Sequence, residues 1–290
     1  SSSDLSVIPT DSANNLSVFA HFSDVAFTPH EPAVEEPQEV GLHTIAFVMS
    51  DGEDLGSLMG RATNPYNGFF TPDDSYPVGW TVSPQLYKLA SPIYKWLHDN
   101  ATDDDMFVGA ASGSGLLYPS LWSDKKAWAQ KTAEDMALVG NRIATVVDYE
   151  SGFNEENLGL LLEDDQVDAV FFSALQSDNF STRQMLWING KPIIPMRRLG
   201  FSDIRTADEI DGWVQQLLAG GLSVGSSGND GYTLVYANLA NTRLSDFQLI
   251  LDALPGPVAD AIQVVRPDTL VQMVTDLVQP QTPTTDKGTE

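Results

Sequence analysis

The segment Ile-Ala-Thr-Val-Val-Asp at residues 143–148 and the segment Asp-Ala-Val-Phe-Phe-Ser at residues 168–173 decide the fold class. Both are apolar at odd and even positions, as expected for strands that are buried on both faces of a parallel sheet. Five further segments have the same character: His43–Met49, Met106–Ala110, Lys191–Met196, Gly231–Asn238 and Ala261–Val265. These segments predict a sheet of short, parallel, buried strands.

Helix signals lie between the predicted strands. Ser83-Pro84 combines an N-cap residue with a proline at the first helical position, and Thr206-Ala-Asp-Glu209 is a capping box. Ser245–Leu254 and Asp268–Leu277 carry apolar residues at helical spacing. Strand–helix alternation over about 240 residues predicts an α/β fold. We expect a (β/α) barrel-like domain with about seven to eight parallel strands, in preference to an open sheet.

Composition excludes several classes of protein. The chain has 290 residues, 15 Lys and Arg against 40 Asp and Glu, a formal net charge of −25 and no cysteine. The missing cysteines exclude disulfide scaffolds, zinc ribbons, iron–sulfur clusters and thiol nucleophiles. The negative charge would repel phosphate backbones, so we expect no nucleic-acid partner. No apolar run is long enough to span a bilayer, so we expect no membrane insertion.

The two ends of the chain differ from its centre. Residues 1–40 are acidic and contain four prolines, which predicts an extended linker or N-terminal extension, and residues 280–290 read as a polar tail or second linker. The domain itself is expected over residues 41–279. The chain begins Ser-Ser-Ser-Asp, so an export signal is expected to be absent or already removed. The terminal segments suggest neighbouring domains or self-assembly.

Polar groups follow the predicted strands, where barrel proteins place their active sites. Carboxylates gather after two of the strands: Asp51, Glu53, Asp54, Asp148 and Glu150. Three interpretations stay open. The carboxylates could form the acid–base pair of glycoside hydrolysis. Asp51, Glu53 and Asp54 could hold a hard cation such as Ca²⁺. Alternatively, Asp51-Gly52 only makes a turn and Asp54 only caps a helix.

A second candidate segment follows the strand at residues 106–110. Gly113 and Gly115 would bring backbone amides close to a ligand, and Tyr118 adds an aromatic face with a hydroxyl group. A tight turn without functional consequence explains the glycines equally well. Trp80 is predicted near a loop, where it would stack on a sugar or belong to the core. Arg197 ends another predicted strand and is a candidate ligand-binding cation.

At this point the sequence resembles a known family. Phe47–Leu55 (FVMSDGEDL), Val78–Ser120 and Val264–Val274 (VVRPDTLVQMV) are similar to segments of the GxGYxYP family, which is associated with glycoside hydrolysis. Leu116 stands where the family loop has its first tyrosine, and Glu53-Asp54 stands where the family has Asp-Asn. The resemblance implies a (β/α) barrel that is secreted or on the cell surface, acts on polysaccharides and is attached to other modules.

Two functions from different classes follow. The first is a glycoside hydrolase-like, carbohydrate-active domain that acts on or binds an extracellular polysaccharide. Its acid–base pair would be Asp51 and Asp148, with Glu53 and Glu150 as substitutes. A sugar subsite would be shaped by the following residues: Gly113, Gly115, Tyr118, Arg197 and Trp80. No cofactor is required.

The second function is a non-catalytic structural or adhesive extracellular module, built on a glycosidase-type barrel that has lost its activity, with Ca²⁺ as its candidate ligand. A third interpretation, a polysaccharide deacetylase, needs paired histidines around a metal ion. The four histidines of the chain, at positions 21, 30, 43 and 98, offer no such pair.

Overall fold

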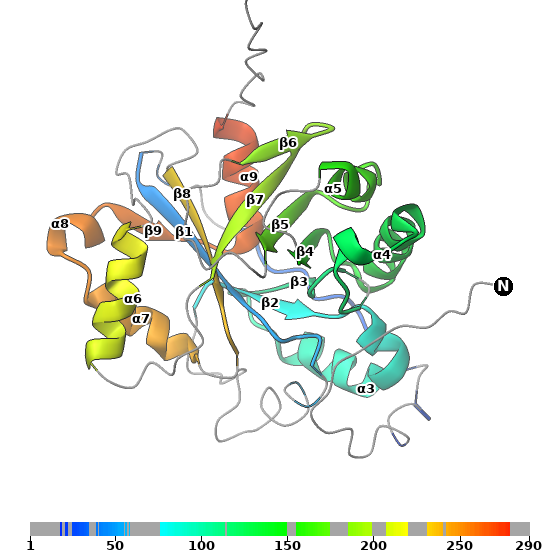
Figure 1. Cartoon of the computed structure of the whole chain (residues 1–290). Coiled ribbons are helices and arrows are strands. Elements are labelled where there is room, and N and C mark those ends of the chain that lie inside the picture. The colour runs from blue at the N-terminus through cyan, green and yellow to red at the C-terminus, as the bar shows by residue number, and fades with distance from the viewer. Residues whose placement is uncertain are drawn as a thin grey trace, which may run out of the picture.

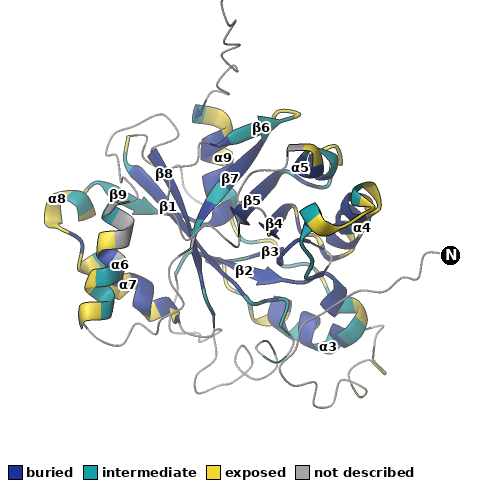
Figure 2. Ribbon diagram, in the orientation of Figure 1, coloured by how far each residue is buried: buried dark blue, intermediate teal, exposed yellow. Residues whose placement is uncertain are grey.

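The computed structural model describes residues 18, 21–22, 25–34, 39, 41–54, 56, 58, 76–113, 115–149, 155–174, 185–198, 207–219, 231–239 and 242–278. Figure 1 shows a central sheet surrounded by helices, with α3, α4 and α5 on one side and α6 and α7 on the other. Most of the strands are buried, as Figure 2 shows by their dark colour, whereas the short β6 and β9 are only half-buried.

The sheet closes into a seven-stranded parallel barrel in the order β1-β2-β3-β4-β5-β7-β8-β1. The structure gives these strand bounds: β1 His43–Met49, β2 Val78–Val82, β3 Asp105–Gly109, β4 Ile143–Asp148, β5 Ala169–Ala174, β6 Leu186–Ile188, β7 Lys191–Arg198, β8 Tyr232–Ala237 and β9 Ile262–Val264. The predicted α/β barrel is confirmed.

Two strands differ from the sequence prediction. Val78–Val82 was not predicted as a strand, yet it forms β2 and closes the barrel by pairing with β1 at Phe47↔Val78. The predicted strand at Ala261–Val265 is the short β9, which pairs only with the first half of β1 and stands outside the barrel. β6 is antiparallel to β7 and adds a short hairpin.

The helices follow the strands in the alternating order that parallel strands require. Their bounds are α3 Gln85–Asn100, α4 Lys125–Val139, α5 Glu155–Leu162, α6 Ala207–Ala219, α7 Leu244–Asp252, α8 Gly256–Ala259 and α9 Pro267–Leu277, with a short 3-10 turn η2 at Pro119–Leu121. The helix expected after Ser83-Pro84 is α3, and those expected at Ser245–Leu254 and Asp268–Leu277 are α7 and α9.

Alternation along each strand separates an inner from an outer core. Ala46 and Val48 of β1 face the barrel interior, whereas the alternating Ile45 and Phe47 pack outward against α3 and α7. Outer residues of β4 and β5 pack against α4 and α5 in a third cluster. Each strand contacts side chains inside the barrel on one face and helices outside it on the other. This is why the strands are apolar at both odd and even positions.

Helix α9 closes the N-terminal end of the barrel. Leu270 and Val274 of α9 are completely buried in the same cluster as the barrel interior. Pro267 lies under Gly79, an inward position of β2, where an added Cβ would come within 2.7 Å of the proline Cγ. The interior is thus covered by apolar contacts at this end, which leaves the C-terminal end for a site.

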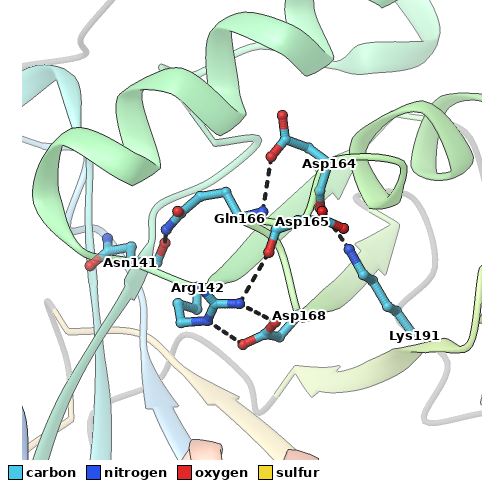
Figure 3. Close-up of polar contacts among 7 residues, drawn as sticks. All are labelled: Asn141, Arg142, Asp164, Asp165, Gln166, Asp168 and Lys191. Carbon is cyan, nitrogen blue, oxygen red and sulfur yellow. Dashed lines mark hydrogen bonds and ion pairs between the residues drawn. The ribbon is translucent and has the colours of Figure 1, made fainter.

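A polar network fastens the same N-terminal end from outside (Figure 3). The Arg142 guanidinium donates two hydrogen bonds to Asp168, at 2.5 and 2.6 Å, and a third to the carbonyl of Asp165 at 3.0 Å. Lys191 Nζ donates to the carbonyl of Asp164 at 2.6 Å. These contacts tie the beginnings of β4, β5 and β7 together beside a cavity of about 500 Å³.

Part of the predicted N-terminal linker lies on the barrel. The backbone amides of Val25 and His30 donate to Ser91 Oγ and His98 Nδ1, at 3.2 and 2.9 Å. Phe27 packs against the rings of Tyr94 and His98. Residues 25–34 therefore run along α3 and cover part of it. In the described part of the chain, no helix is long and apolar enough to cross a membrane.

Candidate active site

The turn after β1 brings a glutamate to the C-terminal end of the barrel. Asp51 adopts a left-handed backbone conformation, with φ of 64°, and its carbonyl accepts a hydrogen bond from the Asp54 amide at 2.9 Å. Gly52 is pressed against β2: its amide donates to Thr81 Oγ1 at 3.1 Å, and a Cβ at this position would overlap the Thr81 carbonyl oxygen. The turn therefore requires glycine and fixes where Glu53 lies.

The surroundings of Glu53 strongly alter the pKa of its carboxyl group. Burial raises its pKa from the usual 4.5 to about 7, and the nearby charges of Asp51 and Asp54 contribute to this rise. The backbone amides of Glu53 itself and Ala111 favour the ionised form but offset only part of this effect. Its Oε2 atom makes no hydrogen bond to any residue that the structure describes. A carboxyl group of this kind can donate a proton near neutral pH.

Asp54 has a structural role, which corresponds to the turn-and-cap interpretation. Its carboxylate accepts a hydrogen bond from the Gly56 amide at 2.8 Å, and its carbonyl accepts one from Leu58 at 3.0 Å. Among the described residues, no group of three acidic or histidine side chains is arranged to hold a metal ion. The structure thus does not bring Asp51, Glu53 and Asp54 together as a set of cation ligands, and the Ca²⁺ site stays a prediction.

Inward-facing polar residues form a ring at the C-terminal ends of several strands. Ser50, Ser83 and Ser173 follow or end β1, β2 and β5 on the parity that faces the interior, and all three are buried. The hydroxyl groups of Ser50 and Ser83 have no hydrogen-bond partner in the described part of the chain. Tyr236 and Asn238 at the end of β8 lie on the same parity. The sequence alone does not distinguish these residues as a site, because a single serine at a strand end carries no signal until it is known which residues of the strand face inward.

The loop after β3 is fixed to its neighbours. The Ser112 amide donates to the Thr145 carbonyl at 2.7 Å and its hydroxyl donates to the Val147 carbonyl at 2.9 Å. Gly113 has φ of 89°, and a Cβ there would overlap the Thr132 side chain. The first glycine of this loop is therefore required by packing, whether or not a ligand binds. The predicted role of Gly115 in a sugar subsite stays a prediction.

Asp148 is placed differently from the expectation. It lies on the outward parity of β4, is 2% exposed, and accepts hydrogen bonds from the Ser120 amide at 3.1 Å and the Ser120 hydroxyl at 2.5 Å. The Tyr149 amide donates to the same carboxylate at 2.7 Å. This environment favours a role in positioning the η2 segment over the predicted acid–base role. Glu150, its predicted substitute, lies outside the described residues.

Two other predicted site residues also differ from the expectation. Trp80 is in the middle of β2 rather than in a loop, faces the outer core, is 4% exposed, and donates its indole N–H to Asp105 at 2.6 Å. The indole ring of Trp80 is therefore not accessible to a ligand at the C-terminal end of the barrel. Arg197 is half-buried near the end of β7, on the face opposite to Ile194 and Met196, which line the interior. Its predicted contact with a ligand stays a prediction.

The histidines that have structural partners lie away from the C-terminal end. His43 begins β1 and its Nε2 contacts Thr233 Oγ1 at 2.9 Å. His98 lies in the last turn of α3, and its Nδ1 accepts a hydrogen bond from the His30 amide. In the described part of the chain, no histidine pair therefore stands at the end of the barrel that carries Glu53. A deacetylase site built on paired histidines finds no support in this arrangement.

The comparisons with known proteins decide the family. The model of the GxGYxYP putative glycoside hydrolase C-terminal domain matches residues 41–275. The chain belongs to the GxGYxYP family. The resemblance predicted from the sequence is thereby confirmed, and the family's description supports a carbohydrate-active domain. No curated protein matches the chain.

Two solved structures resemble this GxGYxYP domain. A putative hydrolase from Bacteroides thetaiotaomicron VPI-5482 has a TM-score of 0.80 and 26% identity, and the match covers 95% of this chain and 53% of that one. The chain thus spans about half the length of that protein. A putative polysaccharide deacetylase from Mycobacterium smegmatis has a TM-score of 0.50 and 12% identity, over 89% of this chain and 98% of that one, and this match supports the fold alone.

The GxGYxYP loop of this chain is Gly113-Ser-Gly-Leu-Leu-Tyr-Pro119. Leu116, at the position of the family's first tyrosine, packs against the cluster that fills the barrel interior. Tyr118 is half-buried, and its ring centroid lies 5.9 Å from that of Tyr149. The loop therefore contributes an apolar cover over the interior and an aromatic group at the rim of β4.

Proposed function

We propose that this domain is a glycoside hydrolase that acts on a polysaccharide, with Glu53 as its general acid. The observation that carries the proposal is a half-buried glutamate at the C-terminal end of a barrel, whose Oε2 atom is inaccessible to solvent and whose pKa is raised, in a family described as glycoside hydrolases. Its pKa of about 7 suits a group that must be protonated before the reaction and must release a proton during it.

In this proposal water adds across the glycosidic bond. Glu53 gives its proton to the oxygen of the leaving sugar, and Asp51 supplies the second carboxylate that this chemistry requires. Asp51 is near enough for its charge to raise the pKa of Glu53. The hydroxyl groups of Ser50 and Ser83 would hydrogen-bond to the sugar, since they have no partner among the described residues. Asp148 would act only through the segment it positions.

An extracellular location and neighbouring domains belong to the same proposal. Polysaccharides are commonly degraded outside the cell because the intact polymer does not cross a membrane, and the family model is itself a C-terminal domain. The chain also covers only 53% of the Bacteroides hydrolase, so a further domain would accompany it in a protein of that length.

Hydrolysis of soluble polysaccharides by the wild type and three variants tests the assignment. Glu53→Gln should lower activity by at least about a hundredfold, and Asp51→Asn should do so comparably. The matched control is Asp165→Asn, at an exposed aspartate near the opposite end of the barrel, and it should keep full activity. Activity of the wild type should also decline above pH 7, because Glu53 then loses its proton. Full activity in Glu53→Gln would refute the proposal.

A non-catalytic module is the second candidate, and the position of Leu116 favours it. An apolar side chain packed on the barrel interior, in place of the family's tyrosine, reduces the polar surface at the mouth. If the wild type hydrolyses no polysaccharide in the panel but binds one, the scaffold function replaces the enzyme. A rise in melting temperature with millimolar Ca²⁺, reversed by EDTA, would support its predicted cation.

A further inference from the structure

Two segments that carry exposed aromatic side chains meet at the rim of β4, where Asp148 joins them. Trp122 and Tyr149 are 47% and 43% exposed, and Leu121 beside them is 64% exposed. The ring of Tyr118 packs against that of Tyr149, with the two planes tilted by 58°. We call Tyr118, Leu121, Trp122 and Tyr149 the aromatic ledge. Exposed apolar groups that gather in one place mark a binding surface more often than isolated ones do.

The ledge is held in place by one buried carboxylate. Asp148 accepts hydrogen bonds from both Ser120 and Tyr149, so it joins the two segments that carry the aromatic rings. The η2 turn adds its own contacts, because the Trp122 amide donates to the Pro119 carbonyl at 3.1 Å. A backbone that is already ordered loses little conformational entropy when a ligand binds. The fold therefore keeps these side chains exposed on a fixed backbone.

The ledge is joined along the chain to the candidate active site. Ala111, whose amide lies at the Glu53 carboxyl group, begins the loop that runs through Gly113 to Tyr118. Figure 2 shows the segment that leads into α4 as exposed, next to the buried strands of the barrel. We expect a long ligand that reaches Glu53 to extend towards the ledge.

We infer that the ledge binds the sugar rings of an uncharged polysaccharide, with Trp122 and Tyr149 as stacking platforms. Aromatic rings bury flat, weakly polar faces, such as the C–H faces of pyranose rings. The net charge of −25 opposes anionic polysaccharides, nucleic acids and acidic membranes, and also opposes association of two copies. The ligand class rests on the proposed function, whereas the location of the surface rests on exposure and contacts alone.

Binding without hydrolysis tests the inference. Affinity would be measured by isothermal titration with mixed-linkage β-glucan, galactomannan and amylopectin, and with carboxymethylcellulose as an anionic probe. All proteins would carry Glu53→Gln so that the probes stay intact. Trp122→Ala and Tyr149→Ala should each weaken binding by about three- to tenfold, as expected when one stacked ring is lost. Phe22→Ala is the matched control, because Phe22 is an exposed aromatic residue, 54% exposed, outside the ledge.

Asp148→Asn gives an independent readout of positioning. It should weaken polysaccharide binding in the same assay while the far-ultraviolet circular dichroism stays unchanged, since an amide cannot accept all the hydrogen bonds from Ser120 and Tyr149. Equal affinity in all variants, or no binding of any neutral probe, would overturn the inference. So would a self-associated protein, seen by sedimentation, that Trp122→Ala makes monomeric. If Trp122→Ala binds polysaccharide as well as its parent while Glu53→Gln alone abolishes hydrolysis, the ledge is not the binding surface. The proposed function is then unaffected.

Discussion

Replacing Glu53 by glutamine should change how the stability of the domain depends on pH. Burial raises the pKa of this carboxyl group from 4.5 to about 7 in the folded protein. Below pH 4.5 the group is protonated in both folded and unfolded states and has no effect on the pH dependence. As the pH rises from 4.5 to about 7 the unfolded state ionises first, so the folded state loses stability. Glutamine cannot ionise, and the variant should escape this loss.

The size of the effect follows from the same values. The interval between 4.5 and about 7 corresponds to roughly 3 kcal/mol, at roughly 1.4 kcal/mol for each pH unit. Relative to the wild type, Glu53→Gln should therefore gain about 3 kcal/mol in unfolding free energy between pH 4 and pH 8. Any constant difference between the two proteins, such as altered packing, cancels in this comparison.

Urea unfolding at a series of pH values between 4 and 8 measures this gain. Glu163→Gln, at an exposed glutamate directly after α5, is the matched control and should leave the pH dependence as it is in the wild type. If Glu53→Gln and the wild type differ by the same amount at both ends of the pH range, Glu53 is not held protonated by burial. The assignment of this residue as the general acid would then lose its physical basis.

Three further predictions concern the framework around the site. Burial lowers the pKa of His98 to about 3, so stability should fall as the pH drops from 6.5 towards 3, and His98→Gln should flatten this decline in urea unfolding. Gly113→Ala should cost about 2 kcal/mol or more in thermal unfolding, because the left-handed backbone and the Thr132 side chain both oppose a Cβ. Asp135 is 2% exposed and binds two lysines, so Asp135→Ala should cost about 3 kcal/mol in chemical unfolding. Lys88→Met, which removes one half-exposed partner, should cost much less.

The sequence identifies most of the barrel because its strands are apolar on both parities. The strand β2 does not meet this criterion. Val78–Val82 has Gly79 and Thr81 at its inward positions, so its sequence is like that of a loop that contains one tryptophan. The inward position of Gly79 is small because Pro267 approaches it, and residue 267 is far away in the sequence. A contact between such distant residues leaves no local pattern. The short β9 is the opposite case. Its apolar residues correctly predict a strand, but this strand only pairs with β1 and does not form part of the closed barrel.

The candidate site could be predicted only in part, for a geometric reason. Polar residues after strands were recognised, and Asp51 and Glu53 follow β1, where barrel sites are expected. Successive side chains of a strand point alternately into the barrel and towards the helices. The direction of the residue that follows a strand therefore depends on whether the last strand residue faces inward or outward. Val147 faces the interior, so Asp148 faces outward, whereas Ser50 faces inward. Strands that are apolar on both faces conceal this parity, so the sequence could not distinguish the roles of Asp51 and Asp148.

The energetics of the turn after β1 argue for a function at Glu53. A scaffold would be more stable with an amide at this position, since the buried carboxyl group loses roughly 3 kcal/mol on ionisation. The same turn holds Asp51 in a left-handed conformation and leaves no space for a side chain at Gly52. The strained backbone of Asp51 and the raised pKa of Glu53 are hard to explain by packing alone, and such features cluster at active sites. Because α9 closes the opposite end of the barrel, a ligand would approach the interior from the end that Glu53 borders.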